Sequence, residues 1–194
     1  FKQKTAYEIM PSLVGSEMCI RDRNQGVRVC ISKWKRISPQ SFKPTAKGVG
    51  GYMNSTLAKI DAVDNGYDDA IMLGDDGTVA EGSGQNIFIV KNNNIFTPPN
   101  STGALNGITR RTVIEIAKSK NISIEEKNLT VEDLKNADEV FFTGTATGVV
   151  GVVSIDGDDI SNGKVGEITS DLISSYEDVV YAKDDNFKSY ITLI

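Results

Sequence analysis

The chain has 194 residues, a formal net charge of −5 and 39% apolar residues, which is ordinary for one globular domain. The negative charge argues against a nucleic-acid-binding protein, and no apolar run approaches the ~18 residues of a membrane helix. Histidine is absent, which excludes Ser-His-Asp and Cys-His nucleophiles as well as histidine-based metal sites. We therefore expect no metal, and chemistry from lysine, carboxylates, hydroxyls, backbone N–H groups or a cofactor.

Residues 1–23 show no clear periodicity and no relation to the rest of the chain. The segment resembles translated sequencing-adapter read-through, and we expect it to be non-native; the alternative is a genuine but irregular N-terminal segment. It lacks the apolar core and cleavage site of a signal peptide, so the expected location is cytoplasmic. The folded domain is predicted to occupy residues 24–194.

Short strands and a few helices alternate along residues 24–194. Apolar periodicity predicts strands at 27–34, 69–73, 78–80, 87–90, 95–97, 122–124, 139–143 and 149–155, and helices at 52–63, 109–118 and 166–181. A capping-box sequence, Thr130-x-x-Asp133, predicts a further short helix. Asp76-Gly77 and Asn92-Asn93-Asn94 are typical of the turns that join hairpin strands. The pattern predicts an α+β domain built on a mixed sheet.

Lys47 lies in a glycine-rich stretch, Ala46-Lys47-Gly48-Val49-Gly50-Gly51, directly before the first predicted helix. Three glycines within four residues let the backbone turn tightly beside a bound group. A lone lysine is usually a solvated surface residue. In a partly dry pocket, however, a lysine loses some preference for its charged form and can attack an aldehyde. Lys47 is therefore the candidate nucleophile.

Glu81 comes at the end of a predicted return strand, before Gly82-Ser83-Gly84. Its position alone is typical of a turn residue. Beside a pyridine ring, a carboxylate keeps the ring nitrogen protonated, and the ring then accepts electron density when a Cα–H bond breaks. Glu81 is therefore the candidate partner of such a ring.

Two segments could bind an anion. Gly107-Ile108-Thr109 opens a predicted helix, where backbone N–H groups bind phosphate without a positive side chain. An N-capping threonine without a ligand explains the same residues equally well. Gly144-Thr145-Ala146 ends a predicted strand with a hydroxyl and free N–H groups. This turn could hold the other side of a phosphate or a substrate carboxylate, or it could be only a turn.

The stretch from Glu81 to Arg110 resembles the complete signature of the class IV pyridoxal-phosphate aminotransferases. It reads E-G-S-G-Q-N-I-F, then I-F-T, then L-N-G-I-T-R, at the family's gaps. Around it, T-A-K-G-V-G-G-Y-M-N-S and F-F-T-G-T-A are similar to branched-chain amino-acid aminotransferases. The resemblance runs from about Gly26 to the C-terminus. It implies the large domain of a fold type IV enzyme, the mixed-sheet pseudo-barrel of D-amino-acid-aminotransferase-like proteins, without its N-terminal small domain.

The resemblance also implies pyridoxal 5′-phosphate as the cofactor and gives four residues roles around its ring. Lys47 would be the Schiff-base lysine and the base that moves the proton. Tyr52 would hydrogen-bond the ring oxygen, and Glu81 would pair with the ring nitrogen. Leu105 would pack against the ring.

Four further positions are implied for the cofactor's phosphate and for the substrate. Ile108 and Thr109 would bind the phosphate at the helix start, helped by Thr145. The N–H groups of Thr145 and Ala146 would receive the substrate carboxylate. The family often has G-T-A-A-E where this chain has Gly144-Thr145-Ala146-Thr147-Gly148, and an Asn is common at Gly51. These departures concern fine positioning rather than the cofactor site.

The implied reaction is transamination between Leu, Ile or Val and 2-oxoglutarate, giving branched-chain 2-oxo acids and L-glutamate, as in branched-chain amino-acid biosynthesis. The partners would be small amino and 2-oxo acids, without nucleic acid or membrane, in a homodimer or larger homo-oligomer. One alternative is a D-amino-acid aminotransferase or aminodeoxychorismate lyase of the same fold, against which Tyr52 within G-G-Y-M-N-S argues. Another is a cofactor-binding fragment without activity.

Overall fold

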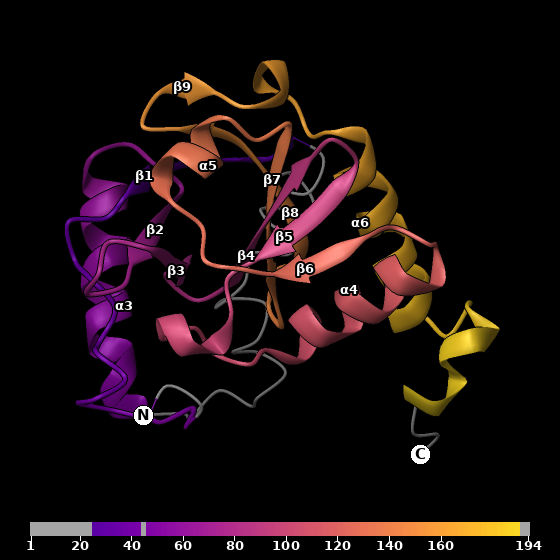
Figure 1. Ribbon diagram of the computed structural model, residues 1–194, viewed down its shortest axis with the longest axis horizontal. Coiled ribbons are helices and arrows are strands. Elements are labelled where there is room, and N and C mark those ends of the chain that lie inside the picture. Colours follow the sequence, from indigo (N-terminus) through magenta and orange to yellow (C-terminus); the bar gives the residue numbers. More distant parts are fainter. Residues whose placement is uncertain (1–24, 44–45, 191–194) are drawn as a thin grey trace, which may run out of the picture.

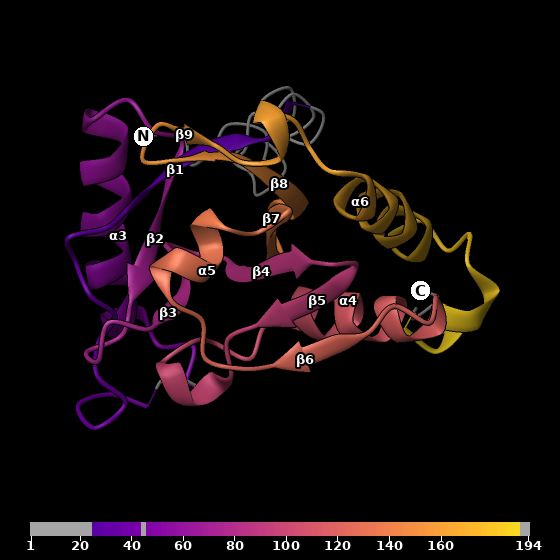
Figure 2. The same ribbon diagram turned by 45° about the horizontal axis from the view of Figure 1, so that its top comes forward.

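The structure, a computed structural model, describes residues 25–43 and 46–190 (Figure 1). The expectation that residues 1–23 are non-native concerns a segment outside this described part and stays a prediction. Within the described chain, one mixed sheet curls into a half-barrel, with α3 at one end and α4 and α6 at the other (Figures 1 and 2).

The sheet has nine strands in the order β3-β2-β1-β8-β7-β4-β5-β6, with β9 paired to β8. Their bounds are β1 Val27–Ile31, β2 Asp69–Leu73, β3 Val79–Gly82, β4 Asn86–Lys91, β5 Asn94–Thr97, β6 Ile124–Glu126, β7 Glu139–Gly144, β8 Gly148–Ile155 and β9 Asp158–Asp159. β1 runs parallel to both β2 and β8, and β5 runs parallel to β6. The remaining pairs are antiparallel, and among them β2–β3 and β4–β5 are the two hairpins that the turn signals predict.

Four α-helices and three short 3₁₀ turns complete the described fold. The helices are α3 Val49–Asp64, α4 Ile108–Ser119, α5 Val131–Lys135 and α6 Glu167–Val180, and the turns are η1 Asn100–Thr102, η2 Ser161–Gly163 and η3 Asp185–Tyr190. The predicted capping box is confirmed, because Thr130 and Asp133 exchange side-chain and backbone hydrogen bonds at the start of α5.

Strand residues alternate between two apolar cores, one on each side of the curled sheet. Ile87 and Ile89 of β4 point to the inside, where Leu134 of α5 closes the core. Phe88 and Val90 point outward to the core shared with α4 and α6. Because both faces of the sheet are covered, the middle of β4 from Ile87 to Val90 is continuously apolar rather than alternating with polar residues. The sheet is therefore a fixed frame for the loops at its edges.

Local turn geometry agrees with the predictions for the β4–β5 hairpin. Asn92 and Asn93 adopt positive φ angles of 51° and 60°, the left-handed conformation that asparagine tolerates. The structure differs at Glu81, which lies within β3 rather than in the following turn. The strand continues because Glu81 pairs with Met72 of β2.

The first long helix differs from the sequence prediction in two ways. α3 begins at Val49 instead of residue 52, so Gly50 and Gly51 form its first turn. Neither has a positive φ, and the expected tight glycine turn is therefore a helix start. In addition, the apolar residues whose spacing predicts the helix face outward, and small residues, among them Ala58 and Ala62, face the sheet.

Candidate active site

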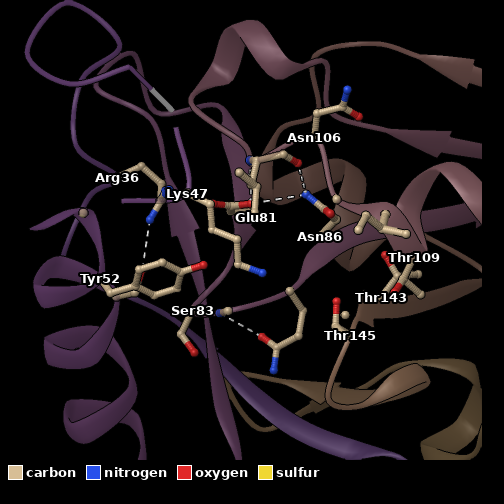
Figure 3. A pocket seen from close by; sticks show the side chains of 18 of the residues that line it. Arg36, Lys47, Tyr52, Glu81, Ser83, Asn86, Asn106, Thr109, Thr143 and Thr145 are labelled. Carbon is tan, nitrogen blue, oxygen red and sulfur yellow. Dashed lines mark hydrogen bonds and ion pairs between the residues drawn. The ribbon is translucent and has the colours of Figure 1, made fainter. Parts of the chain in front are cut away.

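A cavity of ≈ 220 Å³ gathers seven of the eight predicted site residues (Figure 3). They come from the start of α3, from β3, from the start of α4 and from the β7–β8 turn: Lys47, Tyr52, Glu81, Leu105, Ile108, Thr109 and Thr145. Ala146 is not among the lining residues and lies exposed directly after Thr145. Segments far apart in the sequence thus meet at one cavity, at the ends of the strands.

Lys47 precedes the N-cap residue Gly48 of α3 and is exposed. Figure 3 shows its amine extending into the cavity beside the ring of Tyr52. A β-carbon at Gly48 or Gly51 would come within 3.2 Å of the Phe42 ring. These glycines let the loop that contains Phe42 lie against the helix start, so that Lys47 and Tyr52 reach the same cavity.

The carboxylate of Glu81 is buried at the base of the cavity, with three partners. Its Oε1 lies 2.8 Å from Nη2 of Arg36. Its Oε2 accepts hydrogen bonds from the Leu105 N–H at 2.9 Å and from Nδ2 of Asn86 at 3.2 Å. Burial raises the pKa of Glu81 above its ordinary value, while Arg36 and the Leu105 N–H act against this rise. The carboxylate is therefore fixed in position, and its ionised form needs a neighbouring positive charge.

Arg36 is a functional candidate that the sequence analysis missed. It follows β1 in the chain, far from Glu81, and only 14% of its side chain is exposed. Its Nη1 donates to the Ser55 hydroxyl of α3 at 2.9 Å, and its backbone N–H donates to the Leu73 carbonyl. Arg36 thus connects Glu81 to α3. Its spacing from Glu81 carries no local signal for this contact.

Asn86 joins Glu81 to the start of α4. Its Nδ2 also donates to the Leu105 carbonyl at 2.7 Å. Its Oδ1 lies so close to Gly107 that a β-carbon there would be 2.2 Å away. Gly107 is therefore needed for close packing of the α4 start against β4. The sequence does contain a signal for Asn86, because it is a polar residue directly before a run of four apolar residues, Ile87 to Val90.

The start of α4, where the sequence predicts anion binding, has a suitable structure for it. α4 is twelve residues long, and its N-cap Gly107 has no side chain to cap it. The first N–H groups of a helix have no acceptor within the helix, and the helix dipole favours an anion there. Thr109 is 3% exposed, and its hydroxyl lies 3.4 Å from that of Tyr176 on α6. The α4 start therefore lines the cavity with available N–H donors.

Thr143 is a second residue that the sequence analysis missed. It lies on β7, lines the cavity and is 1% exposed. Its hydroxyl is buried and has no hydrogen-bond partner within the described part of the protein. Figure 3 places Thr143 next to Thr109 and Thr145. A buried hydroxyl normally has a partner, so this one indicates a polar ligand on that side of the cavity.

Asp69 holds the cavity wall between β3 and β4. It is 4% exposed and accepts hydrogen bonds from the Ser83 hydroxyl at 2.6 Å and from Nε2 of Gln85 at 3.1 Å. Lys59 of α3 donates to the same carboxylate at 2.9 Å. Ser83 and Gln85 both line the cavity, so Asp69 fixes the turn that comes after Glu81.

These features fit pyridoxal phosphate. An aldehyde group requires an amine, which Lys47 provides, and a ring nitrogen requires a buried carboxylate, which Glu81 provides. The uncapped α4 start and the unpartnered Thr143 hydroxyl fit a phosphate. The side chains of the described residues form no group of three or more metal-binding residues. In the same part of the chain, no helix combines the length and apolar character needed to cross a membrane.

The sequence was compared with known protein families and with curated proteins. The sequence matches the family described as Amino-transferase class IV over residues 3–155. It is 43% identical over 172 residues to a probable branched-chain-amino-acid aminotransferase of Aquifex aeolicus, covering 88% of this chain and 55% of the relative. It is 41% identical over 170 residues to the branched-chain-amino-acid aminotransferase of Pseudomonas aeruginosa, with shares of 88% and 55%. The chain thus spans about half the length of these curated relatives.

Solved structures show the same fold. The branched-chain aminotransferase of Thermoproteus uzoniensis with norvaline superposes with a TM-score of 0.84 at 41% identity, covering 87% of this chain and 56% of that chain. The branched-chain amino acid aminotransferase of Thermobaculum terrenum in its PLP-form superposes with a TM-score of 0.85 at 35% identity, over 88% and 56%. The curled mixed sheet is therefore the fold type IV sheet that the resemblance implied. With a family match over most of its length and a cavity that suits the cofactor, the chain belongs to the class IV aminotransferases.

Proposed function

We propose that residues 24–194 form the cofactor-binding domain of a branched-chain amino-acid aminotransferase. The enzyme would move the amino group between Leu, Ile or Val and 2-oxoglutarate, giving 2-oxo acids and L-glutamate. The observation that carries the proposal is that Lys47, Glu81 and the start of α4 line one cavity. Relatives named branched-chain-amino-acid aminotransferases, at 38–44% identity, support this substrate class.

Each residue near the ring would have a distinct task. Bound pyridoxal phosphate supplies an aldehyde and an electron-accepting ring. The Nζ of Lys47 would form the covalent attachment to the aldehyde with loss of water. Once the amino group of the substrate has displaced it, the free amine of Lys47 would take and return the proton of the substrate Cα. Glu81 would accept a hydrogen bond from the ring nitrogen, with its carboxylate held by Arg36. The Tyr52 hydroxyl would donate to the ring oxygen, and Leu105 would pack against the ring.

The other end of the cavity would bind negative charge. The N–H groups of Ile108 and Thr109 would donate to the phosphate, together with the hydroxyls of Thr143 and Thr145. The N–H groups of Thr145 and Ala146 would receive the substrate carboxylate. Both of these residues are exposed in the β7–β8 turn, which gives an incoming amino acid access. A homodimer and a cytoplasmic location stay predictions.

One observation favours a second state for the 194 residues taken alone. Lys47 is exposed at the cavity, and the chain spans about half the length of its relatives. The second candidate is therefore a domain that binds the cofactor without turnover.

Spectroscopy and turnover together test the proposal. The protein mixed with pyridoxal phosphate should show the absorbance of a lysine-bound cofactor, and Lys47→Ala should abolish it. L-leucine and 2-oxoglutarate should then yield glutamate, whereas D-alanine should not react. Absorbance without turnover would identify the binding-only state. Turnover of D-alanine, or pyruvate from aminodeoxychorismate, would replace the branched-chain assignment, and absorbance unchanged by Lys47→Ala would refute the cofactor site.

A further inference from the structure

Arg110 is the last residue of the signature stretch, and none of the tasks proposed above uses it. It belongs to the first turn of α4, directly after Ile108 and Thr109, but it is not among the residues that line the cavity. Only 2% of Arg110 is exposed. It can therefore act on a bound cofactor only through the residues that it holds in place.

The guanidinium of Arg110 connects the start of α4 to the ends of two strands. Its Nη2 lies 2.9 Å from Oε2 of Glu126, the last residue of β6. The same nitrogen donates to the carbonyl of Pro98, directly after β5, at 3.2 Å. β5 and β6 are parallel neighbours, and α4 lies beside β6 (Figures 1 and 2). One side chain thus links the first turn of α4 to both strands.

A second connection holds the same segment from the cavity side. Asn86 of β4 donates to the Leu105 carbonyl at 2.7 Å. Leu105 precedes the helix and Arg110 lies within its first turn, so the N–H groups of Ile108 and Thr109 come between the two connections in the chain. The direction in which these N–H groups point is therefore set by both.

The position of Arg110 is unfavourable for the cofactor-free protein. A helix dipole disfavours positive charge in the first turn, and the first turn of α4 contains Arg110 and Arg111 but no acid. The Nε of Arg110 is buried and has no hydrogen-bond partner among the residues that the structure describes. An apolar side chain of similar length would avoid both costs. The stability of the fold therefore does not explain this arginine, whereas an anion at the α4 start would offset its charge.

We propose that Arg110 is a positioning residue for the phosphate of the cofactor. Its bridge to Pro98 and Glu126 holds the first turn of α4 so that the N–H groups of Ile108 and Thr109 point at the phosphate. The inference rests on the proposed phosphate site at the α4 start, and it adds a residue that acts on this site from outside the cavity.

The affinities for pyridoxal phosphate and for pyridoxal together test the proposal. The two ligands share the ring and the aldehyde, and only the first has a phosphate, so the ratio of their dissociation constants reports on the phosphate site. In spectroscopic titrations of the full chain, Arg110→Met should weaken binding of pyridoxal phosphate about tenfold and leave binding of pyridoxal unchanged. Arg111→Met, which changes the exposed neighbouring arginine, is the matched control and should alter neither affinity. Equal weakening of both ligands by Arg110→Met would indicate a merely structural role and refute the proposal.

Two further variants separate the bridge from the charge. Arg110→Lys keeps the charge, but lysine is shorter and its ammonium is strongly hydrated, so this variant should also lose affinity for pyridoxal phosphate. Full affinity in Arg110→Lys would show that charge alone matters and would overturn the bridge. Glu126→Ala should weaken binding of pyridoxal phosphate in the unmodified chain but have no further effect in the Arg110→Met chain. Independent, additive effects of the two substitutions would also overturn the bridge.

The stability of the cofactor-free protein gives a readout that does not depend on binding. Arg110→Met should unfold at nearly the same urea concentration as the unmodified chain, because the Glu126 side chain is 49% exposed and water can solvate it. A large loss of stability would contradict the argument that the fold does not need this arginine. An unmodified chain that binds neither ligand would refute the proposed function together with this inference. Unchanged binding of both ligands by Arg110→Met would refute this inference alone.

Discussion

Replacing Arg36 with methionine keeps a side chain of similar length but removes the positive charge next to Glu81. The two groups are 2.8 Å apart, with side-chain exposures of 14% and 8%. Removing one partner of a buried pair costs ~3–5 kcal/mol because the other charge is left uncompensated. We expect the lower end, ~3 kcal/mol, because Glu81 keeps its hydrogen bonds from Leu105 and Asn86.

The loss should depend on pH with a defined sign. Burial already raises the pKa of Glu81, and Arg36 opposes that rise, so the variant's Glu81 should have a still higher pKa. The folded variant then holds this proton more tightly than the unfolded chain does. Its stability therefore falls as pH rises from the ordinary glutamate pKa through the raised folded pKa. The difference from the unmodified protein should be smallest in acid and largest near pH 8.

Urea unfolding at pH 5 and pH 8 measures this difference. Arg111→Met, which changes an exposed arginine on α4, is the matched control and should stay within about 0.5 kcal/mol of the unmodified protein. Adding Glu81→Gln to Arg36→Met should recover part of the loss, because no uncompensated charge remains. A cost below about 1 kcal/mol at pH 8, the same at both pH values, would refute the reasoning.

The remaining predictions concern four positions around the site and the core. Gly107→Ala should lower the free energy of unfolding by ~1–3 kcal/mol and weaken cofactor binding, since the new β-carbon would lie 2.2 Å from Oδ1 of Asn86. Gly50→Ala places its β-carbon in open space within α3, and it should instead stabilise the protein by ~0.5–1 kcal/mol in thermal unfolding. Thr143→Val should leave the cofactor-free protein as stable or more stable but lower its affinity for pyridoxal phosphate in a spectroscopic titration, because the unpartnered hydroxyl disappears; unchanged affinity would contradict this. Glu139→Ala should cost ~1–3 kcal/mol in urea unfolding, because its carboxylate accepts hydrogen bonds from two backbone N–H groups and a hydroxyl at the start of α6; a neutral result would contradict it.

Local sequence patterns were sufficient to predict most of the helices, strands and turns. The hairpin at Asn92-Asn93 and the capping box at Thr130 depend on backbone preferences of a few neighbouring residues. For the same reason the residues that open α4 could be predicted as an anion-binding helix start. Lys47 and Glu81 were predicted as site residues from their chemistry and from a family resemblance. Each could be singled out from the residues next to it, without knowledge of the other residue's position.

The tertiary structure decided which distant groups meet. Arg36 pairs with Glu81 only because the segment after β1 runs beside β2, and Thr143 reaches the cavity only because β7 pairs with β4. The orientation of α3 could not be predicted either. Helical spacing defines a stripe of apolar residues, but it does not say whether that stripe faces the sheet or the outside of the protein. Periodicity and turn preference act over a few residues along the chain. Pairing, burial and the pKa of Glu81 depend on strand order and register, which are set by contacts between segments far apart in sequence.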